Sequence, residues 1–438
     1  MAAPLNIAIV GCGLIGLQLA LGLERRGIKV KVYEQARELK EIGAGVGFAA
    51  PIIEAMRALD PRIANVVEET GFRSGHAGFI DGFSSEDVRL RPKQHLYDFK
   101  LPKGNEQLFT YCQRSLVMGG LAKLVPEGCV EFGKRVDAIE RQGDDEQLVI
   151  KFVDGTEVEV DAVIGCDGIK SRVRRAVLGP EDPAAVPHYA RESAYRCLVD
   201  MDKAHSALGD IALEPVKWVG QNVSLVTYPI AQNKYLNVAA FIRDDGEWPR
   251  EDSQVVESSK EDVIKAYASH GPAIRALCEV LPEKLSRWGL FDTCDHPLST
   301  YAYGAVALAG DAAHGSTPHH GSGAGMGVED ALVLATLLEK ASLDLSSHAT
   351  TTTKTKMIKE VFQTFDAVRR ERSQWLVQSS RYQGALDKGE IEGIERDFAK
   401  YIESSSKRID RIFDHDWKQM VQQSEDMLRG RLEVSAQA

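Results

Sequence analysis

A glycine-rich stretch at residues 11–16, with the pattern Gly-x-Gly-x-x-Gly, constrains the fold of this chain most strongly. Residues 5–10 before it form a short β-branched run, and residues 14–26 carry a helical pattern. Residues 28–34 then alternate like a second strand. A strand, a glycine turn, a helix and another strand form the opening unit of a parallel sheet, which we therefore predict here.

Each glycine of this stretch has a separate predicted role. Gly11 permits the tight turn, Gly13 lets the backbone approach a pyrophosphate, and Gly16 lets the helix pack closely on the strand. Glu34 ends the second strand, 18 residues beyond Gly16, where a carboxylate accepts hydrogen bonds from an adenosine ribose. The sequence therefore predicts a dinucleotide site in a Rossmann-type domain.

The rest of the 438 residues is long enough for a second domain. Three strand-like segments between residues 181 and 284 follow one another without long helices, which predicts an antiparallel or mixed sheet. We expect an α/β plus antiparallel β fold with C-terminal helices. The predicted divisions are a discontinuous dinucleotide-binding domain at 1–75, 105–180 and 285–341; a substrate domain at 76–104 and 181–284; a mobile Ser/Thr-rich loop at 342–356; and a helical segment at 357–438.

Composition excludes several other classes of function. The net charge of −11 argues against nucleic acid as a partner. The seven cysteines form no CxxC pair, so we expect no redox dithiol and no metal site, and a reducing, cytoplasmic location. Glycines interrupt the apolar stretch 7–23 and charges end it, which favours a buried strand and helix over a membrane anchor. No feature indicates an oligomeric state.

Two further motifs each place a Gly/Asp turn after an apolar strand. The first is residues 161–168, which end in Asp167 and Gly168. The second is residues 307–314, which contain Asp311 and lead through Pro318 to a glycine-rich helix start. Each motif alone is common. Together with the N-terminal glycines, in this order, they resemble the single-component flavoprotein aromatic hydroxylases of the para-hydroxybenzoate and salicylate hydroxylase type. Within that family the chain looks most like fungal salicylate-hydroxylase-like monooxygenases, which include the oxidative dearomatases of polyketide biosynthesis.

The resemblance implies FAD as the cofactor and assigns roles to individual residues. Asp311 would contact a ribityl hydroxyl, and the helix start that contains Ala324 would meet the flavin ring. Asp167 would lie near both FAD and the reduced nicotinamide, and Arg114 would reach the FAD ribose or phosphates, unless it is an ordinary surface arginine. Gly45 and Val46, within the glycine-rich loop 43–47, would line the flavin.

The resemblance also implies substrate contacts in the second domain. Arg196 and Tyr228 occupy positions like those of the dearomatases' substrate-orienting arginine and tyrosine, and we expect them on two neighbouring strands of the predicted sheet. A lone cation in an apolar strand needs a partner, so the alternative for Arg196 is a structural salt bridge. The double histidine His319-His320 also resembles the dearomatase branch; for this pair we favour packing or hydrogen bonding over base catalysis.

The expected reaction consumes NADPH or NADH and O₂ and hydroxylates a phenolic small molecule through a C4a-hydroperoxyflavin. The product depends on the substituent at the attacked ring carbon. A hydrogen substituent gives hydroxylation, a carboxylate permits decarboxylation, and an alkyl group gives a dearomatised product. We expect a phenol hydroxylase or oxidative dearomatase of polyketide metabolism. A decarboxylating salicylate hydroxylase-type enzyme and a catalytically silent flavin-binding protein remain the alternatives.

Overall fold

The computed structural model describes residues 5–39, 45–75, 78–82, 87–90, 96–98, 109–142, 147–250, 253–345, 351–395 and 397–437. Gly43 and Ala44 of the predicted flavin loop, residues 346–350 of the predicted mobile loop and much of the segment 76–104 lie outside the described residues.

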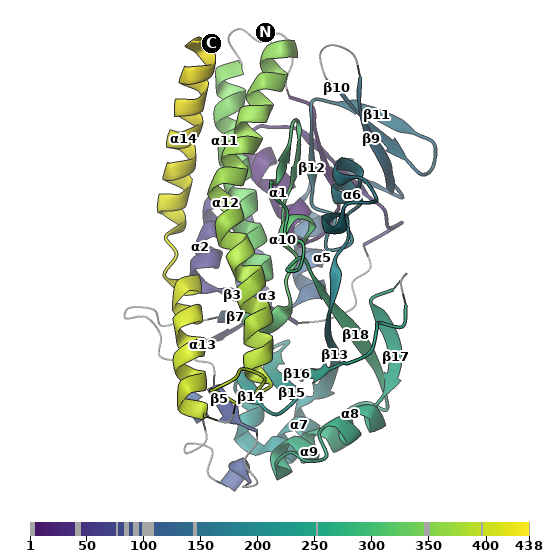
Figure 1. The fold of residues 1–438 in the computed structure, drawn as a ribbon, viewed down its shortest axis with the longest axis vertical. Coiled ribbons are helices and arrows are strands. Elements are labelled where there is room, and N and C mark those ends of the chain that lie inside the picture. The colour runs from purple at the N-terminus through teal and green to yellow at the C-terminus, as the bar shows by residue number, and fades with distance from the viewer. Residues whose placement is uncertain are drawn as a thin grey trace.

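A six-stranded sheet forms the centre of the N-terminal domain (Figure 1). Its order is β19-β20-β12-β1-β2-β8, and every neighbouring pair is parallel except β19 and β20. The bounds are β1 Ile7–Val10, β2 Val30–Glu34, β8 Val130–Phe132, β12 Ala162–Gly165, β19 Ala302–Tyr303 and β20 Val306–Leu308. Two three-stranded sheets accompany it: β9 Val136–Gln142, β10 Gln147–Phe152 and β11 Glu157–Val160; and β3 Gly45–Ala49, β4 Phe72–Ser74 and β7 Phe109–Gln113.

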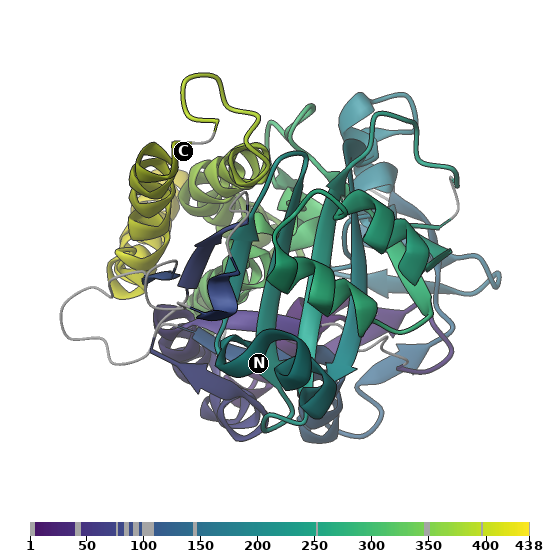
Figure 2. The ribbon, with the colours of Figure 1, turned by 90° about the horizontal axis from the view of Figure 1, so that it is seen from below.

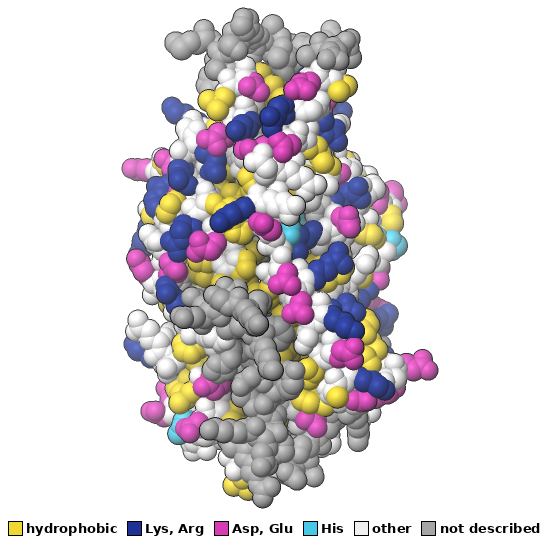
Figure 3. Space-filling model, turned by 90° about the vertical axis from the view of Figure 1, so that its left-hand side faces the viewer, with side chains coloured by type: hydrophobic (Ala, Val, Ile, Leu, Met, Phe, Trp, Pro, Cys, Tyr) yellow, Lys and Arg dark blue, Asp and Glu magenta, His cyan; other side chains and the backbone are white. Residues whose placement is uncertain are grey.

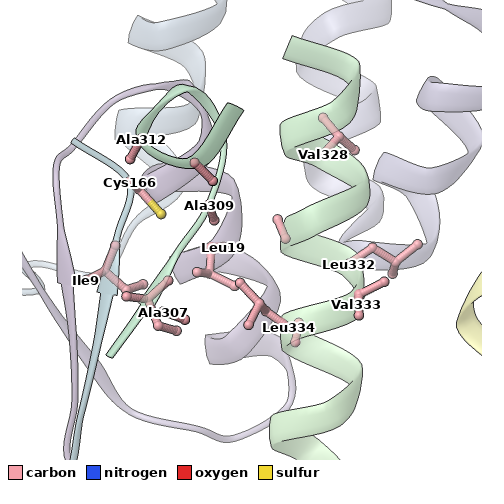
Figure 4. Close-up of a cluster of buried hydrophobic side chains, with 14 of the residues drawn as sticks. Ile9, Leu19, Cys166, Ala307, Ala309, Ala312, Val328, Leu332, Val333 and Leu334 are labelled. Carbon is pink, nitrogen blue, oxygen red and sulfur yellow. The ribbon is translucent and has the colours of Figure 1, made fainter. Parts of the chain in front are cut away.

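Helices bury the six-stranded sheet, as its uninterrupted apolar strands require. Figure 4 shows Leu19 of the first helix beside Leu334 of a later helix, and Ile9 of β1 beside Ala307 of β20, all four fully buried. The helices of this domain are α1 Leu14–Arg25, α2 Ala50–Leu59, α3 Pro61–Thr70, α5 Arg114–Leu124, α6 Arg172–Leu178, α10 Asp311–His314 and α11 Gly323–Leu345.

An eight-stranded sheet forms the second domain, in the order β17-β18-β13-β16-β15-β14-β5-β6. The sheet is mixed, because β14 and β5 pair in parallel. Its strands are β5 Gly78–Asp81, β6 Leu96–Asp98, β13 His188–Asp200, β14 Val216–Val219, β15 Val223–Ile230, β16 Tyr235–Arg243, β17 Val255–Ser259 and β18 Lys284–Asp292. The predicted boundary between residues 284 and 285 is wrong, since β18 continues the sheet by pairing with β13.

Three helices cover the outer face of this sheet: α7 Met201–Leu208, α8 Lys260–Ala266 and α9 Pro272–Glu279 (Figure 2). Outward residues such as Tyr195, Leu225 and Ala240 form one buried cluster with these helices. Because strand residues alternate between faces, Arg196, Val226 and Ala239 point the other way, toward the N-terminal domain.

The C-terminal segment consists of three helices, α12 Thr351–Asp387, α13 Phe398–Phe413 and α14 Trp417–Gln437. The predicted loop at 342–356 is helical at both described ends, because α11 extends to Leu345 and α12 begins at Thr351. Leu345 is buried and Ile358 is fully buried, so apolar packing overrides the low helix propensity of the Ser and Thr residues. Figure 1 shows α12 running alongside both domains.

The exterior carries charges of both signs. On the face shown in Figure 3, Lys and Arg side chains are interspersed with Asp and Glu side chains. No helix in the described part of the chain combines the length and the apolar character needed to cross a bilayer. All seven cysteines are free thiols. The predicted fold class, α/β with an additional mixed sheet and C-terminal helices, is confirmed.

Candidate active site

A cavity of about 500 Å³ is lined by both domains and by the C-terminal helices. Its walls come from the β1–α1 turn, β3, β7, the inner face of the eight-stranded sheet, residues 309–324, α12 and α13. The predicted site residues among its lining are Gly13, Gly45, Val46, Arg114, Arg196, Tyr228, Asp311 and Ala324. The cavity lining does not include the other predicted residues, which are Gly11, Gly16, Glu34 and Asp167.

The β1–α1 turn has the geometry of a pyrophosphate cradle. Gly11 has φ +101°, and a Cβ there would lie 2.6 Å from the Cys166 carbonyl oxygen. A Cβ on Gly16 would lie 2.0 Å from the Gly11 carbonyl oxygen, so helix and strand meet at that point. A Cβ on Gly13 would meet no protein atom within 4 Å. The first and third glycines are therefore required by the protein itself, whereas Gly13 keeps open space beside the cavity.

Glu34 lies beside the same turn. Its carboxylate accepts hydrogen bonds of 2.7 Å from the backbone N–H groups of Cys12 and Ala36. These bonds fix the carboxylate at the end of β2, next to the glycine turn, where an adenosine ribose would bind. The open cradle and the adjacent carboxylate fit the adenosine diphosphate half of FAD.

A second turn, at the end of β20, presents Asp311 to the cavity. Gly310 has φ +60°, and its N–H donates a 2.9 Å hydrogen bond to Asp330 of α11. Asp330 is also bonded to His314 at 2.5 Å and to Arg369 of α12 at 2.8 Å. Burial raises the pKa of Asp330, but His314 and Arg369 outweigh burial and hold that pKa at about 2. The carboxylate therefore stays charged and fixes the Gly310–Asp311 turn.

This role of Asp330 is not predicted from the sequence. Arg369 is fully buried and also pairs with Glu329 at 2.5 Å, while Arg372 bonds the same Glu329 at 2.9 Å. These ion pairs hold α12 against α11.

Asp167 is placed differently from its neighbours. Its carboxylate accepts hydrogen bonds from the Ser171 hydroxyl at 2.5 Å and from the backbone N–H groups of Arg172 and Val173. It therefore holds the first turn of α6, and it does not line the cavity. Cys166 and Gly168 on either side of it do line the cavity.

The remaining predicted cofactor residues surround the middle of the cavity. Gly45 and Val46 begin β3, and the Gly45 N–H donates to Asn237 Oδ1 at 3.3 Å. A Cβ on Gly45 would lie 2.1 Å from the Tyr228 hydroxyl oxygen, so only glycine fits against that ring. Arg114 starts α5 with an exposed side chain, and Ala324 lies in the first turn of α11.

Arg196 and Tyr228 lie on the same face of the eight-stranded sheet. The expectation that their strands are neighbours is wrong, because β16 lies between β13 and β15. The cross-strand register aligns Arg196 with Ala239 and Ala239 with Val226, two residues before Tyr228. Since side chains alternate along a strand, Arg196 and Tyr228 both face the cavity.

The Arg196 guanidinium stacks on Trp288, with Cζ 5.6 Å from the ring centre. Its Nε atom is buried without a hydrogen-bond partner, and no ion pair of this side chain is found among the residues that the structure describes. Burial lowers the pKa of Arg196, and nearby Tyr228 partly opposes that effect. Arg196 thus brings a cation to the cavity wall, and its Nε donor has no partner among the described residues.

Tyr228 stacks on Tyr111 with ring centres 4.6 Å apart. Burial raises the pKa of Tyr228 to about 12, although Arg196 opposes the shift. The Tyr228 hydroxyl is therefore protonated at neutral pH and can donate a hydrogen bond.

The double histidine packs against the other domain and α12. His319 Nε2 lies 3.0 Å from Glu192 Oε2, and His320 Nε2 lies 2.9 Å from Ser379 Oγ. Burial, followed by the positive charge of Lys217, lowers the pKa of His320 to about 3. Both contacts agree with the favoured interpretation of this pair as packing and hydrogen-bonding residues.

The lowered pKa of His320 predicts a pH-dependent stability. The folded pKa of about 3 lies below the unfolded value of about 6.5, so the unfolded chain binds more protons between these pH values. Stability should therefore fall as the pH drops below about 6.5. We expect His320→Gln, which removes the titration, to reduce the loss of unfolding free energy between pH 7 and pH 5 by on the order of 1 kcal/mol. Denaturant unfolding at a series of pH values measures this slope.

His205→Gln is the control for this prediction, because half of the His205 side chain is exposed on α7. It should leave the wild-type pH slope in place. An unchanged slope in His320→Gln would show that another group carries the acid sensitivity.

Several cavity residues carried no signal in the sequence. Trp288 and Tyr111 support Arg196 and Tyr228, but isolated aromatic residues in strands are usually core residues. The contribution of α13 was also missed. Its apolar residues match an ordinary packing helix, yet Ile409, Ile412 and Phe413 line the cavity.

Comparisons with known proteins identify the family of this chain. Residues 5–349 match the family described as FAD binding domain. The chain is 43% identical to the FAD-dependent monooxygenase pigN of Monascus ruber over 432 residues, 98% of each chain. It is 41% identical to salicylate hydroxylase asL1 of Sarocladium schorii, covering 86% of this chain and 81% of that protein. A solved structure of a salicylate hydroxylase substrate complex superposes with a TM-score of 0.80 at 27% identity, covering 96% of this chain and 98% of that one. The chain belongs to the FAD-binding-domain family and, within it, to the FAD-dependent monooxygenases of the salicylate hydroxylase type.

Proposed function

We propose that this monooxygenase hydroxylates a phenol that Arg196 and Tyr228 hold as its phenolate, with NADPH or NADH as the reductant and O₂ as the oxidant. The observation that carries the proposal is the unpartnered Nε of Arg196 beside the cavity. Arg287, on the next strand of the same sheet, is instead neutralised by Asp244 and bonded to Ser193. A buried cation without a counter-ion is costly, and a phenolate would supply the missing charge.

Arg196 and Tyr228 would share the substrate oxygen. The guanidinium would stabilise the negative charge and so lower the pKa of the bound phenol. The neutral Tyr228 hydroxyl would donate a second hydrogen bond and fix the ring's orientation. Ionisation raises the electron density of the ring carbons, which is what attack on an electrophilic oxygen requires.

The residues around the glycine cradle fit FAD. Glu34 would bind the adenosine ribose, Gly13 would leave room for the pyrophosphate, and Asp311 would bind the ribityl chain. Gly45 and Ala324 would bracket the ring system. When bound, FAD supplies the chemistry of accepting a hydride from the nicotinamide and delivering oxygen.

The cavity wall would protect that chemistry from water. Phe109 and Phe413 meet edge to face with ring centres 5.4 Å apart, and Ile409 and Ile412 also line the cavity. An apolar enclosure strengthens the charge–phenolate interaction and limits the loss of reactive oxygen to water.

For the product, we propose oxidative dearomatisation or hydroxylation of a polyketide phenol. This assignment is supported by the identity to fungal FAD-dependent monooxygenases and by the double histidine. A decarboxylating reaction is the second candidate, because relatives in sequence and structure are salicylate hydroxylases. Carbon dioxide release from a salicylate-type probe, measured with the product's mass, separates the two.

A substrate screen tests the proposed function. We expect resorcinol-like or salicylate-like phenols to accelerate NAD(P)H oxidation, and ketones and amines of similar size to have no effect. Phenols alone can present the oxyanion that Arg196 and Tyr228 would bind. The measurement is the initial rate of NAD(P)H oxidation by the FAD-loaded enzyme, with hydrogen peroxide and product quantified in parallel.

Stimulation confined to non-aromatic compounds would contradict the proposal. A protein that binds FAD but responds to no compound would instead match the silent flavin-binding alternative.

A further inference from the structure

Two buried polar groups of the C-terminal helices line the cavity without a partner. Gln383 of α12 is 1% exposed and Ser405 of α13 is 2% exposed. Gln383 Oε1 and Ser405 Oγ have no hydrogen-bond partner among the residues that the structure covers. An unpaired polar atom in such a place destabilises the fold, so these two point to a missing ligand group.

The contacts between α12 and α13 bring the two residues together. Asp387 of α12 bonds Tyr401 of α13 at 2.9 Å, and Ser379 of α12 bonds Arg408 of α13 at 3.1 Å. The helices therefore run antiparallel at this point. Gln383 lies midway between Ser379 and Asp387, and Ser405 lies between Tyr401 and Arg408, so these two residues face each other across the helix pair.

The Gln383 amide has a fixed orientation. Its Nε2 donates a 2.7 Å hydrogen bond to Asp387 Oδ1. Asp387 also accepts hydrogen bonds from Lys217 at 2.8 Å and from Tyr401 at 2.9 Å. A carboxylate surrounded by donors accepts only, so the amide nitrogen must face it and the amide oxygen is left for the cavity.

One row of the eight-stranded sheet places this pair relative to Arg196. Cross-strand pairing aligns Arg196, Ala239, Val226 and Lys217 in that order on β13, β16, β15 and β14. All four residues line the cavity. At about 4.8 Å per strand, the first and last backbones lie about 14 Å apart. Lys217 donates a hydrogen bond to Asp387, which also accepts one from Gln383. Between Arg196 and Lys217 in this row lie two apolar residues, Ala239 and Val226.

We propose that Gln383 and Ser405 form a second polar subsite that binds an uncharged hydroxyl of the substrate, at the far end of the molecule from the phenolate. A hydroxyl can donate to Gln383 Oε1 and accept from the Ser405 hydroxyl, so it satisfies both groups. A substrate carboxylate would place a negative charge against the amide oxygen of Gln383. We therefore expect the subsite not to bind a carboxylate. This inference rests on the proposed function, because Arg196 defines the phenolate end.

The test compares matched phenols on the FAD-loaded enzyme. The probes are 5-alkylresorcinols of graded chain length, each with its ω-hydroxyl and its terminal carboxylate counterpart. Dissociation constants come from the change in flavin absorbance on binding, and kcat/KM from stimulated NAD(P)H oxidation. At the chain length that spans the row, the hydroxylated probe should bind roughly tenfold more tightly than the alkyl probe, and the carboxylate probe no better than the alkyl probe.

Ser405→Ala is the sharpest variant, because its hydroxyl has no hydrogen-bond partner within 3.5 Å among the described residues and only approaches the Tyr401 hydroxyl. It should lose most of the preference for the hydroxylated probe, bind the alkyl probe as before, and unfold at an unchanged or higher temperature. Gln383→Met should lose the preference as well. Gln378→Met, at an exposed position of α12, is the matched control and should keep it.

Equal binding of hydroxylated and alkyl probes by the wild type at every chain length would overturn the subsite and leave the proposed function intact. Persistence of the preference in both Ser405→Ala and Gln383→Met would do the same. If no phenol binds or stimulates the FAD-loaded enzyme, the proposed function itself fails.

Discussion

Gly13→Val is expected to yield a folded protein that has lost its FAD. A Cβ at this position meets no atom within 4 Å in the described part of the chain, so the apoprotein should fold normally. The new side chain would occupy the space beside the cavity through which the pyrophosphate passes. Forcing that overlap costs more than about 3 kcal/mol, which weakens FAD binding by at least about a hundredfold. Flavin absorbance after reconstitution and circular dichroism measure the two properties separately.

Gly119→Val is the matched control, because a Cβ on Gly119 of α5 also meets nothing within 4 Å, and this glycine does not line the cavity. That variant should remain yellow. Full FAD content in Gly13→Val would mean that the cofactor does not pass the β1–α1 turn.

Arg196→Ala should bind FAD normally and lose roughly tenfold to hundredfold in phenol-stimulated turnover. The lost interaction is a charge-assisted hydrogen bond to the phenolate, worth about 1.5–3 kcal/mol. Tyr228→Phe keeps the stacking on Tyr111 and removes one donor, so its loss should be smaller. Both variants should release more hydrogen peroxide per NAD(P)H consumed. A poorly oriented substrate ring is not hydroxylated, so the reduced oxygen is released as peroxide. FAD content, unfolding temperature and the ratio of product to NAD(P)H consumed are the measurements.

Arg287→Ala provides the comparison. Arg287 stacks on Trp248 at the same 5.6 Å as Arg196 on Trp288, but its guanidinium is paired with Asp244 and it lies outside the cavity lining. This variant should lower the unfolding temperature and leave coupling unchanged. The opposite pattern, with Arg196→Ala unstable but normally coupled, would make Arg196 a structural residue.

The cofactor side of the cavity could be predicted because its determinants are local in sequence. Gly11, Gly13 and Gly16 belong to one turn, and Glu34 ends the next strand, so spacing alone predicts their proximity. Asp167 shows the limit of motif reasoning. Its position in the chain matched the motif, but its carboxylate was already required by the first turn of α6.

The substrate side depends on contacts that chain order does not specify. Arg196 and Tyr228 were expected on neighbouring strands because their strands were recognised in order, yet β16 folds back between them. The alternation of side chains still put both on one face. Gln383 and Ser405 had no counterpart in the sequence interpretation, because a polar residue on an amphipathic helix is usually exposed. Their burial follows from how α12 and α13 dock.

Helix α12 has a mechanical consequence for substrate exchange. Its 37 residues span about 55 Å. Asp366 accepts from the Tyr301 backbone N–H near the six-stranded sheet, while Asp387 binds Lys217 on the eight-stranded sheet. The half of the helix from Asp366 to its C-terminal end at Asp387 thus connects the two domains. Hinge opening between the sheets would break these bonds together, so we expect phenols to enter and leave through small local displacements, with the two domains moving as one body.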